Sequence, residues 1–497
     1  MPTTSKHLLI ISGLEANGFA GTVRDIQVSM ALGISASAIV TMLTAQNSHG
    51  MTVNQAVPVK VIIEQLKNLL AIPKVIKIGA LPNKEISTAI AQWLQTLNAN
   101  KPNVILDPIY ASSGDASRFS KQTLTNVLEP LLPFIDLLTP NNAELRRLTP
   151  ALNRGYSADI NIINYLENKP SFRGRLLVKS VNENASAPDV KDILAKRSCV
   201  LELIYFSQPK QTAAMRGTGC LLSTAIACAL CEDHPIESAV ALASAYLSRE
   251  LSARKGLVAT STALPQIDWP MNIIYYPQIH LENVTSSLNN AFPALDINQG
   301  LYPIVDTSEW ILKLAKLGVR TIQLRVKDKP LHEVRDEVKR AIEISQTFEL
   351  QLCINDYWQL AIEFGAYGVH LGQEDLQSAN LEKVLSSGLR LGVSTHGDYE
   401  FLLARNLRPS YLAVGAIYPT QTKDMSNKIQ GLKRLERYCQ MAGSIPIVAI
   451  GGISIKNIEQ VLEKGPNFVA VVSAITQSPT PEKSTALLMQ HIQSKNS

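Results

Sequence analysis

Short runs of β-branched and aliphatic residues alternate with longer amphipathic segments along most of the chain. Such runs predict strands, and the segments between them, with apolar residues three or four positions apart, predict helices. In the N-terminal half the predicted strands cover residues 8–13, 35–44, 75–81, 103–108, 134–140, 175–180 and 199–206. This alternation predicts an α/β domain built on a doubly wound sheet.

The periodicity fades between residues 256 and 299, where Pro, Asn, Ser and Thr accumulate. Such composition is typical of a loop or linker, here with room for a short helix or two. The 497 residues also exceed the size at which one hydrophobic core stops growing. We therefore predict a first domain over 1–255, a linker over 256–299 and a second domain over 300–497.

The alternation resumes after the linker with eight strand-like runs. They cover residues 301–306, 320–327, 350–356, 367–373, 390–396, 411–419, 445–452 and 467–474, and helical segments separate nearly all of them. Eight βα units in about 200 residues match the smallest TIM (β/α)8 barrels. An open parallel sheet of eight strands is the alternative.

Composition excludes several classes of protein. The net charge of +5 is spread along the chain without Lys/Arg-rich blocks, so we expect no nucleic-acid partner and small anionic substrates instead. No apolar stretch reaches the length of a membrane span, and six scattered cysteines do not make a disulfide scaffold, so we expect a cytoplasmic protein. Cys228 and Cys231 form a CxxC inside an apolar helical run, which favours helix packing over a redox or zinc role.

Polar residues close the predicted strands of the C-terminal half, which is where a TIM barrel carries its active site. Gln323, Arg325 and Lys327 alternate along one strand and therefore project to one side of it. Three donors on one face suit a phosphate or a polar ring, although an exposed strand end also collects charge.

Two acidic residues follow adjacent strands and predict a magnesium site. Asp356 ends the run at 350–356, and Asp375 lies in the loop after the run at 367–373. Mg²⁺ is usually held by one or two carboxylates together with substrate phosphates. A solvated rim or a pair of helix N-caps is the alternative.

The last three strands end in groups suited to anions. Thr420, Thr422 and Lys423 offer two hydroxyls and a cation after a proline. Gly451 and Gly452, and then Val472 and Ser473, occupy the loops that recurrently bind phosphate in this fold. The glycines alone also fit a tight turn.

In the N-terminal half, the run at 216–227, RGTGCLLSTAIA, is the strongest single feature. Gly217, Gly219 and Cys220 open an apolar helix, which predicts an anion hole for a phosphoryl group and a lowered pKa for the thiol. A helix start made of small residues around a buried cysteine is the alternative. Asn141 and Glu144, one helical turn apart beside a strand end, suit Mg²⁺ and nucleotide phosphates.

The C-terminal runs QLRVKD, INDYWQLA, GVHLGQEDL, LGVSTH, YPTQTK, AIGGI and VAVVSAI resemble thiamine-phosphate synthase over residues 301–480. The resemblance implies that the residues contacting hydroxymethylpyrimidine diphosphate are Gln323, Leu324, Arg325, Val326, Lys327, Asn355, Ser394 and Lys423. It implies that Asp356 and Asp375 hold Mg²⁺. The residues implied to face thiazole phosphate and the adjoining diphosphate are Thr420, Gln421, Thr422, Gly452, Val472 and Ser473.

The reaction that this resemblance implies depends more on neutralising the charge of the leaving group than on proton transfer. An electron-rich aminopyrimidine expels diphosphate to leave a stabilised methylene cation, with Mg²⁺, Arg325 and Lys423 neutralising the leaving group. The thiazole nitrogen then attacks the cation. His370 and His396 are left as proton carriers or as packing residues.

The N-terminal runs MLTAQNSHG, DPIYASSGD, TPNNAELRRL and RGTGCLLSTAIA resemble the hydroxymethylpyrimidine phosphate kinase branch of the ribokinase-like family over residues 7–250. The resemblance assigns pyrimidine binding to Gln46, ATP phosphates and Mg²⁺ to Asn141 and Glu144 with Gly217 and Gly219, and phosphoryl-transfer catalysis to Cys220.

This half departs from the family pattern at three places. Leu14, Glu15, Asn17 and Phe19 replace expected residues in the opening run. Lys179 is retained, but Ser180, Val181 and Asn182 follow it instead of Gly-Gly-His. Arg216 stands where a histidine is usual.

Three hypotheses therefore stay open. The chain is a kinase fused to a synthase that consumes its product, or the N-terminal half is a non-catalytic pyrimidine-binding or dimerisation module, or the barrel acts on another phosphorylated substrate. The expected partners are small phosphorylated heterocycles, and a homo-oligomer is left open.

Overall fold

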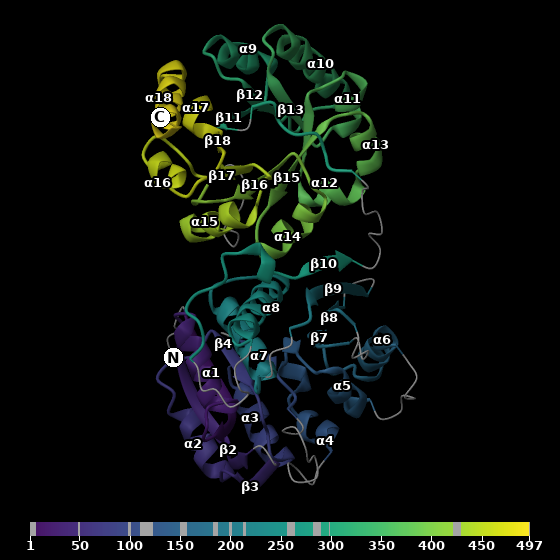
Figure 1. The fold of residues 1–497 in the computed structure, drawn as a ribbon, viewed down its shortest axis with the longest axis vertical. Helices are drawn as coiled ribbons and strands as arrows, with labels where there is room; N and C mark the ends of the chain where they lie inside the picture. Colours follow the sequence, from purple (N-terminus) through teal and green to yellow (C-terminus); the bar gives the residue numbers. More distant parts are fainter. Residues whose placement is uncertain are drawn as a thin grey trace. The chain divides into compact units, whose positions relative to one another are not determined.

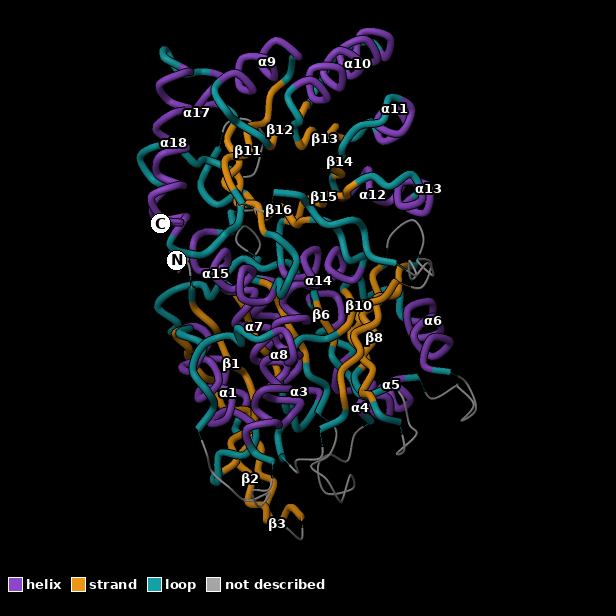
Figure 2. The backbone as a smooth tube through the Cα atoms, turned by 45° about the horizontal axis from the view of Figure 1, so that its top comes forward, coloured by secondary structure: helices purple, strands orange, loops and turns teal. Residues whose placement is uncertain are grey.

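The structure is a computed structural model that forms two compact units. The first comprises Met1–Pro270 with Ile274–Thr285, and the second comprises Met271–Ile273 with Ser286–Ser497. The structure describes residues 6–47, 50–97, 101–109, 123–149, 157–181, 187–197, 201–211, 215–255, 264–281, 290–297, 299–420 and 429–496. Figures 1 and 2 show the elements of each unit.

The first unit is built on one mixed sheet in the order β10-β9-β8-β7-β6-β5-β4-β1-β2-β3. The strands are β1 (His7–Glu15), β2 (Ser35–Asn47), β3 (Gly50–Ala56), β4 (Val75–Ile78), β5 (Asn103–Leu106), β6 (Leu137–Leu138), β7 (Arg175–Val178), β8 (Asp189–Lys196), β9 (Glu202–Pro209) and β10 (Gln278–Leu281). The pairs from β2 through β1 and β4 to β7 are parallel, and β3, β8, β9 and β10 pair antiparallel at the two edges.

Helices flank this sheet. They are α1 (Gly21–Ala31), α2 (Val59–Lys67), α3 (Lys84–Gln95), α4 (Leu124–Leu128), α5 (Asn142–Leu148), α6 (Ala158–Asn168), α7 (Thr218–Cys231) and α8 (Ile236–Ala253). The central parallel strands are apolar on both faces because helices cover both; Leu8 to Ile11 of β1, for example, are fully buried.

Helix α7 lies in the core of the first unit. It packs against α8, α1 and β4, and its residues from Cys220 to Cys231 are all buried, as expected for a helix that is apolar on every side. Cys228 and Cys231 are free buried thiols of this helix, in agreement with the packing interpretation.

The second unit is a closed barrel of parallel strands in the order β11-β12-β13-β14-β15-β16-β17-β18, and the pairing of β11 with β18 closes it. The strands are β11 (Gly300–Val305), β12 (Thr321–Leu324), β13 (Gln351–Asn355), β14 (Gly368–Leu371), β15 (Arg390–Thr395), β16 (Tyr411–Gly415), β17 (Ile447–Ile450) and β18 (Phe468–Val471). The closed order confirms the predicted TIM barrel and excludes the open sheet.

The barrel helices lie outside the ring of strands (Figure 2). They are α9 (Ser308–Lys316), α10 (Leu331–Thr347), α11 (Trp358–Glu363), α12 (Gln373–Ser378), α13 (Leu381–Ser386), α14 (Asp398–Asn406), α15 (Gly431–Met441), α16 (Ile458–Leu462), α17 (Ser473–Thr476) and α18 (Pro481–Asn496).

Side chains fill part of the barrel interior. A buried cluster comprises Tyr302, Ile304, Cys353, Tyr411, Ala413, Val448, Phe468 and Ala470. Gly392 of β15 makes room for Tyr411 of the neighbouring strand, because a Cβ at position 392 would lie 2.0 Å from the Cζ of that ring. Any larger residue at this position would displace the tyrosine from the barrel interior.

The range 256–299, predicted as a linker, is described only in part. Its described residues include the 3₁₀ turn Ile273–Tyr275 and strand β10, which pairs with β9 at the edge of the N-terminal sheet. The boundaries of the predicted domains stay a prediction. Among the described residues, no helix is long and apolar enough to cross a membrane.

Candidate active sites

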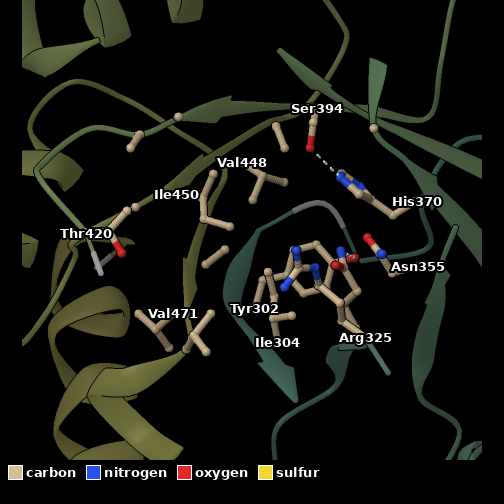
Figure 3. Close-up of a pocket in the computed structure, with 18 of the residues that line it drawn as sticks. Tyr302, Ile304, Arg325, Asn355, His370, Ser394, Thr420, Val448, Ile450 and Val471 are labelled. Atoms are coloured by element: carbon tan, nitrogen blue, oxygen red, sulfur yellow. Dashed lines mark hydrogen bonds between the residues drawn. The ribbon is translucent and has the colours of Figure 1, made fainter. Parts of the chain in front are cut away.

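A cavity of about 980 Å³ opens where the barrel strands end. Its wall includes residues from β11 to β18 and from the loops that follow them. In Figure 3, Arg325, Asn355, His370 and Ser394 lie on one side of this cavity, and Thr420, Ile450 and Val471 lie on the other. This is the end of the barrel at which the sequence predicts the site.

Strand β12 and the residues after it supply cationic and amide groups to the cavity. Gln323 is buried, Arg325 is half-buried and Lys327 is exposed, and all three line the wall. Their alternation follows from the two-residue period of an extended chain. Val326 also lines the cavity, whereas Leu324, predicted as a contact, is buried and does not line it.

Asp356 and Asp375 come together on the cavity wall. Asp356 directly follows β13 with a φ of 65°, a left-handed conformation that aspartate tolerates better than most residues. Its Oδ2 accepts a hydrogen bond from Asn355 Nδ2 at 2.5 Å. Burial and then the neighbouring Asp375 raise the pKa of Asp356 to about 6, although Arg325 and Lys327 act in the opposite direction.

A chain of polar side chains runs from the cavity wall into the barrel. His370 Nε2 lies 2.8 Å from Ser394 Oγ, and Figure 3 shows these two side chains pointing toward each other. The other ring nitrogen, Nδ1, lies 2.9 Å from the hydroxyl of Tyr411. Burial, followed by the positive charge of Arg325 and by His396, lowers the pKa of His370 to about 3. The ring of His370 is therefore neutral at physiological pH.

His396 is tied to the start of α14. Its Nδ1 lies 2.9 Å from Glu400 Oε2, and its backbone N–H donates to the same oxygen. This pairing gives His396 a structural partner, although its side chain also lines the cavity.

The opposite wall carries the residues predicted to bind phosphate. Thr420, Gly452, Val472 and Ser473 all line the cavity. The remaining predicted contacts, Gln421, Thr422 and Lys423, lie outside the described residues.

The N-terminal site forms where α7 begins. Gly217 adopts a φ of +73°, and a Cβ there would lie 1.9 Å from the carbonyl oxygen of Phe19, so only glycine lets this turn pack against the loop after β1. Gly219 faces a buried ion pair: a Cβ there would lie 3.3 Å from Lys179 Nζ and 3.5 Å from Asp107 Oδ2. The α7 N-terminus and the retained lysine thus meet at one point.

Asp107, which directly follows β5, organises this point. Its Oδ1 accepts from Lys179 Nζ at 2.7 Å and from Thr139 Oγ1 at 3.1 Å, and its Oδ2 accepts from Ser223 Oγ at 3.3 Å. Burial would raise the pKa of Asp107, but Lys179 and Lys77 outweigh it and lower that pKa. The side chain is therefore held as a carboxylate.

Asn141 and Glu144 form a reciprocal cap at the start of α5. Asn141 Oδ1 accepts from the Glu144 N–H at 2.9 Å, and Glu144 Oε2 accepts from the Asn141 N–H at 2.8 Å. Burial raises the pKa of Glu144 to about 7, against the effect of Lys179 and with that of Asp107. Both residues therefore cap α5, and Glu144 does so close to the charges of Lys179 and Asp107.

The expectation of an acidic Cys220 thiol is wrong. Burial is the largest effect and raises the pKa of this thiol to about 11, although Lys77 opposes it. Cys220 is only 5% exposed, so the hydration that a thiolate would lose there dominates its pKa. At neutral pH the group is a thiol.

Arg216 and Gln46 meet at the edge of this site. Arg216 Nη2 donates to Gln46 Oε1 at 3.2 Å. The loop after β1, which departs from the family pattern, is held by hydrogen bonds within itself. Glu15 accepts from Asn17 Nδ2 at 2.8 Å and from the Phe19 N–H at 2.9 Å. The residues that depart from the family pattern at positions 15, 17, 19 and 216 thus lie in one region with Gln46, the residue predicted to bind the pyrimidine.

The sequence interpretation missed two groups. The buried pair of Asp25 and Lys77 left no signal, because a helix and a distant strand bring these residues together. Tyr302 and Tyr411 lie inside apolar runs, where a tyrosine looks like any core aromatic. Asp107 was not missed in the same way, because it opens the run DPIYASSGD, one of the runs that resemble the kinase family.

Comparison with known proteins finds a matching family for each half of the chain. The family model of thiamine monophosphate synthase matches residues 301–475, and that of phosphomethylpyrimidine kinase matches residues 16–264, half of the chain. The thiamine-phosphate synthase of Serratia proteamaculans is 51% identical over 210 residues, which are 42% of this chain and 99% of the relative. That of Citrobacter koseri is 50% identical over 198 residues, 40% of this chain and 94% of the relative.

Solved structures resemble each unit. Phosphomethylpyrimidine kinase from Clostridium difficile has a TM-score of 0.40 at 23% identity and covers 50% of this chain and 99% of its own. Thiamine phosphate pyrophosphorylase from Pyrococcus furiosus has a TM-score of 0.36 at 27% identity and covers 40% of this chain and 97% of its own. By the sequence matches, the chain belongs to the phosphomethylpyrimidine kinase family over residues 16–264 and to the thiamine-phosphate synthase family over residues 301–475.

Proposed function

We propose that this chain carries out two consecutive steps of thiamine phosphate synthesis. The N-terminal unit transfers a phosphoryl group from ATP to hydroxymethylpyrimidine phosphate. The barrel then joins the resulting diphosphate to thiazole phosphate and releases diphosphate. The observation that supports the barrel reaction most is the meeting of Arg325, Lys327, Asp356 and Asp375 on the wall of one cavity.

The acidic pair fits a divalent cation. Burial and then the neighbouring Asp375 raise the pKa of Asp356, and a bound cation would offset the repulsion between the two carboxylates. Among the residues that the structure describes, no third His, Cys, Asp or Glu side chain joins them in a metal-ligating group. This is the usual arrangement for Mg²⁺, which takes water and substrate phosphates as its other ligands and would neutralise the charge of a departing diphosphate.

The side chains of the barrel would serve the chemistry by placing charge and excluding water. Arg325 and Lys327 stabilise the negative charge that grows on the leaving group. Ile304, Val448 and Ile450 line the cavity with apolar surface. This surface limits the access of water, which would otherwise capture the methylene cation before the thiazole nitrogen attacks it.

In the N-terminal unit, too, the proposed catalysis depends on placed charges and hydrogen-bond donors and not on a thiolate at Cys220. We propose that Lys179, held by Asp107 beside Gly219, meets the transferring phosphoryl group together with the N–H groups that open α7. Cys220 acts there as a neutral thiol, because its pKa is raised to about 11.

Replacing Cys220 with alanine removes its S–H donor while keeping the backbone N–H, and is expected to lower ATP-dependent phosphorylation by about 10²-fold, as for the loss of one donor to transition-state charge. The measurement is ADP release with hydroxymethylpyrimidine phosphate as acceptor. Cys228→Ala is the matched control, since Cys228 is a buried thiol of the same helix whose first turn carries Cys220, and it should leave the rate unchanged. Equal rates for Cys220→Ala and the unsubstituted protein would contradict the proposed role.

The Mg²⁺ requirement of the barrel should depend on pH. The pKa of Asp356 is raised to about 6, so its carboxylate is charged above that pH and takes up a proton below it. The Mg²⁺ concentration at half-maximal synthase rate should therefore rise by about tenfold for each pH unit below 6 and level off above 7. A half-maximal concentration that is constant between pH 5 and 7 would exclude Asp356 as a ligand.

The function as a whole is tested by two reactions of the pure protein with Mg²⁺ and thiazole phosphate. Hydroxymethylpyrimidine phosphate with ATP, and hydroxymethylpyrimidine diphosphate without ATP, should both yield thiamine phosphate. Product from the second reaction alone would make the N-terminal unit a non-catalytic module. Product from neither would contradict the proposal.

A further inference from the structure

Five side chains of the barrel form one continuous hydrogen-bonded chain. Gln323 Nε2 donates to Tyr302 Oη at 3.4 Å, and the hydroxyls of Tyr302 and Tyr411 are 2.7 Å apart. Tyr411 Oη lies 2.9 Å from His370 Nδ1, and His370 Nε2 lies 2.8 Å from Ser394 Oγ. Both ends of the chain, Gln323 and Ser394, line the cavity proposed to bind the pyrimidine.

The members come from different strands of the barrel. Tyr302 lies on β11, Gln323 on β12, His370 on β14, Ser394 on β15 and Tyr411 on β16. Both tyrosines are at most 2% exposed, and their hydroxyls are satisfied inside the protein. The thiol of Cys353 lies beside both hydroxyls as a weak further partner. Gly392 is required for the chain, since it leaves the space that Tyr411 occupies.

The hydrogen bonds of the chain can be polarised in two directions, since each tyrosine hydroxyl both donates and accepts and a neutral imidazole has two tautomers. In one direction, Tyr302 accepts from the Gln323 amide and donates its hydroxyl proton to Tyr411. Tyr411 then donates to His370 Nδ1, so the only ring proton of the imidazole is on Nε2 and is donated to Ser394 Oγ. With its oxygen already accepting from His370, Ser394 is left with its own O–H to donate into the cavity.

We propose that the chain takes this direction and that Gln323, Tyr302, Tyr411 and His370 are positioning residues that fix the Ser394 hydroxyl as a donor, so that the barrel selects a heterocycle presenting a ring nitrogen lone pair at that point. The inference rests on the proposed synthase function and names how that site recognises its pyrimidine. The two tyrosines act on Ser394 through the direction of the chain. A ring with C–H or N–H at that point would offer no lone pair to accept the hydrogen bond from Ser394.

The test is a double-mutant cycle read by calorimetric binding of hydroxymethylpyrimidine diphosphate and by KM and kcat. Tyr411→Phe removes the donor to His370 and keeps the ring; it should raise Kd and KM by about tenfold, the value of one well-placed hydrogen bond, with little change in kcat. In a Ser394→Ala protein the same substitution should change Kd less than twofold. Tyr438→Phe is the matched control, because Tyr438 is a buried tyrosine of α15 whose hydroxyl donates to Gln430, and neither of these residues lines the cavity.

A second measurement uses two analogues in which one or the other ring nitrogen of the pyrimidine diphosphate is replaced with C–H. One analogue should bind the unsubstituted protein about tenfold more weakly than the pyrimidine, and this discrimination should vanish in Ser394→Ala and shrink in Tyr411→Phe. Equal effects of Tyr411→Phe with and without Ser394, or equal affinity for both analogues and the pyrimidine, would overturn the inference. The rate of the unsubstituted protein tests the proposed function separately, since the binding ratios need no turnover.

Discussion

Replacing Asp356 with asparagine is expected to lower kcat/KM for thiamine phosphate formation by about 10²–10³-fold at saturating Mg²⁺, which is the usual effect of removing one group that stabilises transition-state charge. The substitution keeps the size of the side chain and removes the charge. It also ends the burial of a charge and the repulsion by Asp375, which together raise the pKa of Asp356, so the protein should lose activity without losing stability.

The matched control is Asp336→Asn on the outer helix α10, where the carboxylate is exposed and does not line the cavity. Both variants are compared by steady-state kinetics over a range of Mg²⁺ concentrations. The control should keep the full rate. If Asp356→Asn also kept it, the acidic pair would not be the metal site.

Replacing Asp25 with alanine is expected to destabilise the N-terminal unit by about 3–5 kcal/mol, because it leaves the ammonium of Lys77 buried without its counter-charge. The two side chains are fully buried, and Lys77 Nζ lies 2.6 Å from Asp25 Oδ2. Burial alone would lower the pKa of Lys77, but the attraction of Asp25 outweighs it and raises that pKa. Thr224 Oγ1 donates to the other oxygen of Asp25 at 2.7 Å and loses its acceptor as well.

Urea unfolding of the full chain measures this effect in the transition that belongs to the N-terminal unit. The double substitution Asp25→Leu with Lys77→Met is the control. Replacing a whole buried pair with apolar residues of similar size costs much less than breaking it. A single variant as stable as the double variant would mean that the pair is not held as charges.

The strands were predicted best from the sequence in the barrel, where each strand is buried on both sides. Seven of the eight barrel strands lie within predicted runs, and β11 begins one residue before its run, because a parallel barrel strand covered inside and outside must be almost continuously apolar. In the N-terminal sheet, β3, β8 and β10 were missed. Polar residues alternate in β3 and β8, and β10 has only four residues at an edge, so none of them shows a long apolar run.

For the sites, the sequence predicted which residues end strands but not how burial alters them. Arg325, Asp356 and Ser394 line one cavity because they end parallel strands of one barrel. The pKa of Cys220 was expected to be low from its place at a helix start, yet that place is buried in the folded chain. The hydrogen-bonded chain from Gln323 to Ser394 could not be predicted, because it depends on Gly392 admitting a tyrosine from the next strand.

The central claim is that cations and carboxylates at one end of the barrel hold a departing diphosphate. A crystal structure of the protein with Mg²⁺, diphosphate and thiamine phosphate tests it most directly. We expect the metal between Asp356 and Asp375, the diphosphate in contact with Arg325, and the pyrimidine ring against Ser394. A metal bound elsewhere, or a diphosphate remote from Arg325, would contradict the account.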